Sequence, residues 1–175
     1  MKKKTINLKE TSFTQAINIS AQWCKEWGED LLSEEVLADR VAELIKTKNG
    51  LRGFFAYALS DQDCYLLDKL PFSIVFKLQE GGNDVVEIVV KNLIMSSAQI
   101  IIHQRQNNID YKLTSENISE RCKGILRLLE TKLVTNTINE VVKELDNLGN
   151  SFDNSTKYDD QQKEFIRQQI FDIAQ

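Results

Sequence analysis

The chain has 175 residues, of which seven are glycine and one is proline. This scarcity excludes collagen-like and Pro/Gly-rich disordered chains, and it disfavours all-β folds, whose many tight turns need both residues. The formal net charge of −4 disfavours nucleic acid as a partner, because DNA- and RNA-binding proteins usually carry a basic surplus.

Two helices are predicted at the start of the chain. Ser12 and Gln15 have the spacing of a capping box, in which two side chains satisfy the free N–H groups at a helix start. Apolar residues follow at helical spacing as far as Gly28, which ends the helix. Ser33 predicts the start of the second helix, and Gly50, preceded by asparagine, predicts a left-handed residue that ends it.

The next two segments are short. Residues 51–59 are almost wholly apolar, which is compatible with either a buried strand or a buried helix. Residues 63–70 predict a short helix that ends before Pro71, because the residue before a proline avoids the helical region.

Residues 71–106 allow two interpretations. In the first, alternating apolar and polar residues form an antiparallel hairpin at 72–90, and the protein is α+β. In the second, Pro71 marks a helix start and Gly81 a helix end, and a long helix follows. We choose the second interpretation. The chain is therefore predicted to be an all-α, multi-helix bundle of about seven to nine helices, with a long central helix at about 84–106.

The remaining helices are predicted from capping patterns. Patterns that begin at Asn117 and Thr137 predict two helix starts, and Gly149 ends the second helix. We expect residues 1–149 to form a helical core domain and the polar residues 150–157 to be a linker. Residues 158–175 are predicted to be an amphipathic C-terminal helix that packs on the core or on a partner subunit.

Two stretches of the chain, residues 50–59 (GLRGFFAYAL) and 89–98 (VVKNLIMSSA), have a familiar sequence, and the second runs on to His103 and Arg105. They resemble an uncharacterised family of small soluble cyanobacterial proteins. The resemblance implies a helical cytoplasmic protein and supports the helical interpretation of 84–106. It implies no activity and no site residue.

His103 is the only histidine, and it stands close to Arg105 at the end of an apolar stretch. A general base needs a nucleophile and an orienting carboxylate, and no sequence motif supplies either one here. The favoured interpretation is a surface histidine at a helix end. Arg52 stands beside two phenylalanines that could border an anion site or a partner site, although such aromatic side chains more often lie in a core.

Metal and cofactor sites are not predicted. The paired acids at Asp61 and Asp63, and at Asp159 and Asp160, lack the further oxygen ligands of a cation site and are expected to cap helices. Glycines 81 and 82 have no phosphate-loop context. The three cysteines are far apart in the sequence, and we expect them to be reduced and mostly buried.

Neither the longest apolar stretch nor the basic start of the chain indicates that the protein binds a membrane. The longest apolar stretch, residues 85–102, is interrupted by charged side chains, so we expect no membrane span. The basic residues Lys2 to Lys4 are not followed by an apolar segment, so we expect no signal peptide and a cytoplasmic location.

We therefore expect a non-enzymatic protein-interaction or regulatory module, with a protein partner or self-association into a homodimer. One alternative is a small-molecule enzyme or ligand-binding protein that uses His103 and Arg105. A second alternative is a DNA-binding regulator of the helix-turn-helix type, in which residues 118–129, with the small basic cluster Arg121, Lys123 and Arg127, would lie in a groove. No catalytic, cofactor-binding or metal-binding residue is assigned.

Overall fold

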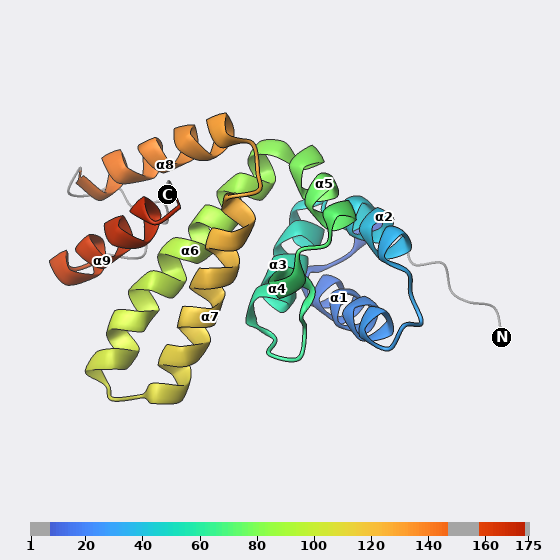
Figure 1. The fold of residues 1–175 in the computed structure, drawn as a ribbon, viewed down its shortest axis with the longest axis horizontal. Coiled ribbons are helices and arrows are strands. Elements are labelled where there is room, and N and C mark those ends of the chain that lie inside the picture. Colours follow the sequence, from blue (N-terminus) through green and yellow to red (C-terminus); the bar gives the residue numbers. More distant parts are fainter. Residues whose placement is uncertain (1–7, 147–157, 174–175) are drawn as a thin grey trace. The chain divides into compact units, whose positions relative to one another are not determined.

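The computed structural model describes residues 8–146 and 158–173 (Figure 1). Within these two ranges the chain forms nine α-helices and one short 3₁₀ helix, with no strand. The all-α prediction is confirmed, and residues 72–90 are helical. The elements are η1 (Leu8–Glu10), α1 (Phe13–Gly28), α2 (Glu34–Leu44), α3 (Lys48–Ser60), α4 (Leu66–Lys69), α5 (Phe72–Glu80), α6 (Gly82–Arg105), α7 (Ile109–Leu126), α8 (Thr131–Asp146) and α9 (Asp160–Phe171).

The helices form two compact units, Met1–Gly81 and Gly82–Gln175. The predicted boundaries did not include this division between α5 and α6. The predicted linker at 150–157 and the helix end at Gly149 lie outside the described residues, so these boundaries stay predictions.

In the first unit, α1 packs chiefly against α3, and α2 against α5. Gly53 permits the close approach of α1 and α3, because a Cβ at this position would lie 2.4 Å from the Cβ of Ala16. Phe54 and Phe55 are fully buried beside it, with ring centroids 5.1 Å apart in an edge-to-face arrangement. These two aromatic side chains are therefore core residues.

Two predicted helix starts in this unit are confirmed. The side chain of Ser12 accepts a hydrogen bond from the backbone of Gln15, whose own side chain accepts one from the backbone of Ser12. Ser33 caps α2 through the backbone N–H of Val36. Both hydroxyls satisfy N–H groups that lack a partner within the helix.

The predicted helix end at Gly50 is wrong, because Gly50 lies in the first turn of α3. Thr47 caps that helix by accepting a hydrogen bond from the Gly50 N–H at 3.0 Å. A Cβ on Gly50 would lie 1.9 Å from the carbonyl oxygen of Leu44. The glycine therefore makes room for the preceding helix, and α2 ends earlier, at Leu44.

The predicted capping role of Asp61 and Asp63 is also wrong. Asp61 follows the last residue of α3, and its carboxylate accepts a hydrogen bond from the Asp63 N–H at 2.9 Å. The carboxylate thus stabilises a turn and not a helix start. The short helix α4 begins later than predicted, at Leu66, and ends at Lys69, after which the left-handed residue Leu70 precedes Pro71.

In the second unit, α6 is the central helix. It runs antiparallel to α7, and α8 and α9 pack on it as well (Figure 1). The hydroxyls of Ser96 and Ser97 are buried and donate to the carbonyl oxygen of Leu93, so the small side chains leave no polar group unsatisfied. The predicted central helix at 84–106 is confirmed.

By length and composition alone, α6 is the one described helix that could cross a membrane. In the structure, 61 % of its most apolar 18-residue window is buried inside the protein. Packing against α7, α8 and α9 accounts for this apolar composition.

Two helix starts in this unit were predicted too late. Asn117 lies inside α7, which begins at Ile109 and is capped by the side chain of Asn108. Thr137 lies inside α8, where it is buried on the same face as Val134 and Val141. The capping pattern, a polar residue with an acid three positions later, also occurs inside helices. At Asn117 and Thr137 it does not mark a helix start.

Candidate functional site

The predicted candidates His103 and Arg105 lie in the last turn of α6, at the end of the hairpin that α6 forms with α7. Asn107 turns the chain with a φ of 53°, and the N–H of Asn108 donates to the carbonyl oxygen of His103 at 2.9 Å. The His103 ring lies against Tyr111, with centroids 5.5 Å apart and planes tilted by 32°. Its Nδ1 atom is buried and has no hydrogen-bond partner among the described residues.

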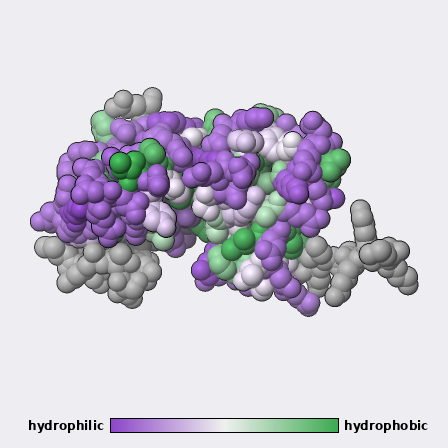
Figure 2. Space-filling view, turned by 90° about the horizontal axis from the view of Figure 1, so that it is seen from below, coloured by the Kyte–Doolittle hydropathy of each residue, from purple (hydrophilic) through white to green (hydrophobic). Residues whose placement is uncertain are grey.

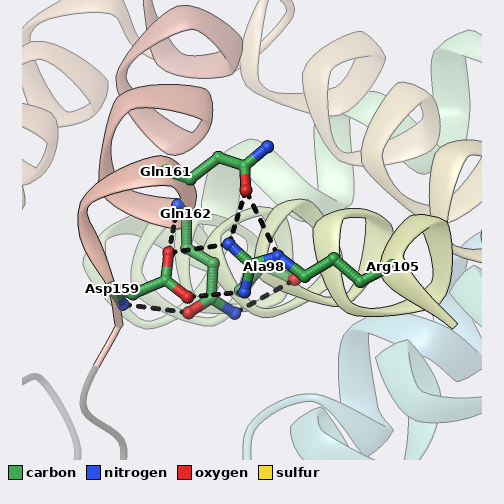
Figure 3. A network of polar contacts seen from close by, with 5 residues as sticks. All are labelled: Ala98, Arg105, Asp159, Gln161 and Gln162. Carbon is green, nitrogen blue, oxygen red and sulfur yellow. Dashed lines mark hydrogen bonds and ion pairs between the residues drawn. The ribbon is translucent and has the colours of Figure 1, made fainter.

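Arg105 holds the start of α9 (Figure 3). Its guanidinium donates to both carboxylate oxygens of Asp159, at 2.6 and 3.1 Å, and to the side-chain oxygen of Gln161. This forked geometry is the one in which arginine binds a carboxylate most strongly. Arg105 therefore fixes a helix of its own unit, and its charge is already paired.

Asp159 connects this contact to the capping of α9. Its side chain accepts a hydrogen bond from the Gln162 N–H, and the Gln162 side chain accepts one from the Asp159 N–H, which confirms the predicted helix cap. The Gln162 amide also donates to the buried carbonyl oxygen of Ala98 on α6. The hydrogen bond from Arg105, followed by the one from the Gln162 backbone, lowers the pKa of Asp159 to about 2.

Arg52 belongs to the first unit, on α3. Its guanidinium lies 5.2 Å from the centroid of the Phe13 ring on α1, within the range of a cation–π contact. The two arginines predicted as candidates are thus each bound within a different unit.

In the predicted basic cluster, Arg121 and Lys123 on α7 are buried, whereas Arg127, which follows the last residue of α7, is exposed. Lys123 is 5 % exposed and donates to the side-chain oxygen of Gln169 on α9 at 3.0 Å. It also pairs with Glu120 and with Asp172. Arg127 donates to the carbonyl oxygen of Asp172 at 2.7 Å. Lys123 and Arg127 hold the second half of α9 through these contacts.

Among the described residues, the side chains that could bind a metal ion are not grouped together. No three histidine, cysteine, aspartate or glutamate side chains lie together there in a way that could hold an ion. The three cysteines are thiols and are buried, as predicted.

The first turns of α7 carry exposed apolar side chains that the sequence analysis missed. Ile109, Tyr111 and Leu113 are 71 %, 62 % and 52 % exposed, and we call these three residues the hairpin-end surface. Seen from below, the end of the hairpin carries a small green patch bordered by purple residues (Figure 2). Asn108 is the sequence signal that could have revealed this surface. An asparagine at this position predicts a helix start, and residues 109–113 would then lie in the first turns of that helix.

The comparisons with known proteins identify a family but no activity. A family model described as "Uncharacterised conserved protein UCP020893" matches residues 12–173, which is more than nine tenths of the chain. No curated protein and no solved structure matches the chain.

Proposed function

The chain belongs to this uncharacterised conserved family, and we propose that the protein is a non-enzymatic interaction or regulatory module that associates with a second copy of itself. The observation that carries the proposal is the hairpin-end surface. Ile109 and Leu113 are one helical turn apart and both more than half exposed. Apolar side chains grouped in this way favour burial against another protein surface.

The charges around this surface favour a second copy as the partner. In a two-fold symmetric contact, each patch meets the same patch of the other subunit, so a strongly charged patch repels itself. Here Lys112 pairs with Glu116 on the same helix, and Arg105 pairs with Asp159 nearby in the same unit. Asp110 adds a negative charge between Ile109 and Tyr111 in the sequence, and with the neighbouring charges paired we expect self-repulsion to be small.

The face formed by α2 and α5 in the first unit is less suited to self-association. It also exposes large apolar side chains, above all Phe72, which is 82 % exposed. The acids Glu34, Asp39 and Glu80 lie on these two helices, and Lys77 bridges the last two. The same face on a second copy would bring like charges together.

The enzyme alternative receives less support. It needed His103, Arg105 and Arg52 to converge on one pocket with free polar groups. Arg105 is bound by Asp159 and Gln161, and Arg52 lies over the Phe13 ring, so each of these guanidinium groups already has a partner. We also propose that the protein is soluble, cytoplasmic and of cyanobacterial origin, which the resemblance of residues 50–59 and 89–98 supports.

The oligomeric state tests the proposal. We expect light scattering and sedimentation to give a mass that rises from one chain toward two as the protein concentration increases. The double variant Ile109→Ser/Leu113→Ser should raise the dimer Kd by about tenfold or more, because it removes apolar area from both sides of a symmetric contact. Phe72→Ser is the matched control, since it removes a more exposed apolar side chain elsewhere.

Two outcomes contradict the proposal. A mass of one chain at about 0.5 mM protein would exclude self-association in the range where even weak dimers form. Association that Phe72→Ser weakens as much as the double variant would exclude the hairpin-end surface as the interface.

A further inference from the structure

The outer face of α5 carries two aromatic side chains that lie outside the buried core of the first unit. Phe72 and Phe76 are one helical turn apart, and they are 82 % and 47 % exposed. The residues that α5 buries are on another side of the helix: Ile74, Val75 and Leu78. The packing of α5 on its unit therefore uses these residues, and the two phenylalanine rings are available to another molecule.

Acidic side chains border this face on the side of α2. The hydroxyl of Ser73 donates to the carboxylate of Glu34 at 2.5 Å, so the starts of α2 and α5 lie side by side. The first turn of α2 carries Glu35 as well as Glu34. Because Phe72 directly precedes Ser73, its ring is at the same end of the helix pair as these two carboxylates.

The helix pair has a surplus of negative charge. Together α2 and α5 carry five acidic and two basic side chains. Both bases are already engaged, since Arg40 donates to Glu26 of α1. Lys77 bridges Asp39 and Glu80. The face thus combines exposed aromatic rings with an acidic border, and its charge is complementary to a basic partner.

We propose that the outer face of α5 binds an amphipathic helix of another protein, in which basic side chains flank an apolar stripe. Two rings one turn apart fit between apolar side chains that repeat every turn of a second helix. The basic side chains of that helix pair with the carboxylates along α2. Binding at this face does not require self-association through the hairpin-end surface.

Binding of a synthetic peptide to the whole protein tests the proposal. The probe is a fluorescein-labelled peptide of about 16 residues, with leucine along one helical face and lysine on both sides of that face. We expect fluorescence anisotropy to give a Kd below about 100 μM at about 50 mM salt. The Kd should rise severalfold at about 300 mM salt, because the charges are then screened.

Two control peptides separate charge from the apolar stripe. One has glutamate in place of every lysine, and the other has the same composition as the probe with its leucines scattered around the helix. Both should bind at least about tenfold more weakly than the probe, because each lacks one of the two matching features.

The protein variants are made in the Ile109→Ser/Leu113→Ser background, so that the hairpin-end surface does not contribute. Phe72→Ser/Phe76→Ser should raise the Kd of the probe by about tenfold or more. Phe72→Ser alone changes a side chain that is 82 % exposed, so it should leave the circular dichroism spectrum unchanged and still weaken binding. Phe171→Ser, at an exposed phenylalanine of α9, is the matched control and should leave the Kd unchanged.

The acidic border is tested by Glu34→Gln/Glu35→Gln, which should reduce the dependence of the Kd on salt. The proposal is wrong if the probe does not bind at about 0.5 mM protein, or if either control peptide binds as tightly. It is equally wrong if Phe171→Ser weakens binding as much as Phe72→Ser/Phe76→Ser. If Phe72→Ser weakens self-association of the unaltered chain but not peptide binding, the face binds a second copy and not a basic helix. A chain that does not self-associate is still expected to bind the probe, so the two proposals can fail separately.

Discussion

At the scale of single residues, two glycines of the first unit differ in what surrounds them. Gly53 lies inside α3 at the contact with α1, where an added Cβ would meet the Cβ of Ala16 at 2.4 Å. Gly28 is the last residue of α1, and an added Cβ would have no neighbour within 4 Å. The same substitution is therefore an overpacking change at one position and a surface change at the other.

We expect Gly53→Ala to lower the free energy of unfolding of the first unit by about 1–3 kcal/mol, because α1 and α3 must move apart. Gly28→Ala is the control and should change it by no more than about 1 kcal/mol, in the stabilising direction, because alanine favours helix. Urea unfolding followed by circular dichroism measures both changes. Equal effects of the two variants would contradict the close contact at Gly53.

At the scale of helices, α9 is held at both of its ends by polar contacts. Arg105 and the backbone at Ala98 hold its start against α6. Lys123 and Arg127 hold its second half against α7. Between these contacts, Ile166 is fully buried, so the position of α9 is defined by polar groups at the ends and apolar packing in the middle.

The contact at the start of α9 makes stability depend on pH. The pKa of Asp159 is lowered to about 2, from 3.8, so the folded state favours the charged carboxylate. Its contribution to stability is complete above about pH 4 and is lost as the pH falls to about 2. We expect Asp159→Asn, which can still cap the helix, to reduce the decrease in Tm over this range.

Asp160→Asn is the matched control for this measurement, because it removes one carboxylate from the same helix turn without removing the partner of Arg105. Thermal unfolding between pH 2 and pH 5 should separate the two variants. If both change the pH dependence equally, the effect belongs to the general charge of the helix start, and the pairing with Arg105 contributes nothing to it.

Helices could be predicted from the sequence more reliably than their starts. Ser12, Ser33 and Asp159 were found because each precedes an amphipathic stretch and has a side chain that can accept a backbone hydrogen bond. Asn117 and Thr137 have the same pattern but lie inside helices. Local sequence alone cannot separate the two cases, because a helix that has already begun continues through a capping residue when its apolar face is buried.

The site shows a similar limit. His103 and Arg105 could be singled out from the sequence, because a lone histidine and a nearby arginine are visible as residue types. Their partners could not, since Tyr111 and Asp159 come from α7 and from the start of α9. Pairs of this kind depend on how helices pack, which a periodic pattern does not specify.

At the scale of the whole molecule, the chain consists of two units with separate cores. We expect Gly53→Ala to shift one part of the thermal unfolding curve and Ile166→Ala to shift another. The cost of Ile166→Ala should be about 2–5 kcal/mol, because it leaves a cavity between α9 and α6. Calorimetry measures the two effects, with Phe171→Ala as the control, since Phe171 is on the same helix and 65 % exposed.

A single transition that both variants shift by the same amount would contradict this expectation. It would mean that the two cores unfold together, as one cooperative system. Different responses would identify which part of the curve belongs to which unit.

The order in which the second unit is assembled follows from the place of α9 in the chain. A protein folds as it leaves the ribosome, beginning with its earlier segments. The long apolar helix α6 is made before α7, α8 and α9, all of which cover it. Part of its surface must therefore stay uncovered until residues 160–171 have been synthesised. During that interval the nascent chain offers an apolar helix long enough to be bound by a chaperone or by a membrane, and a chain truncated before α9 would keep that surface permanently.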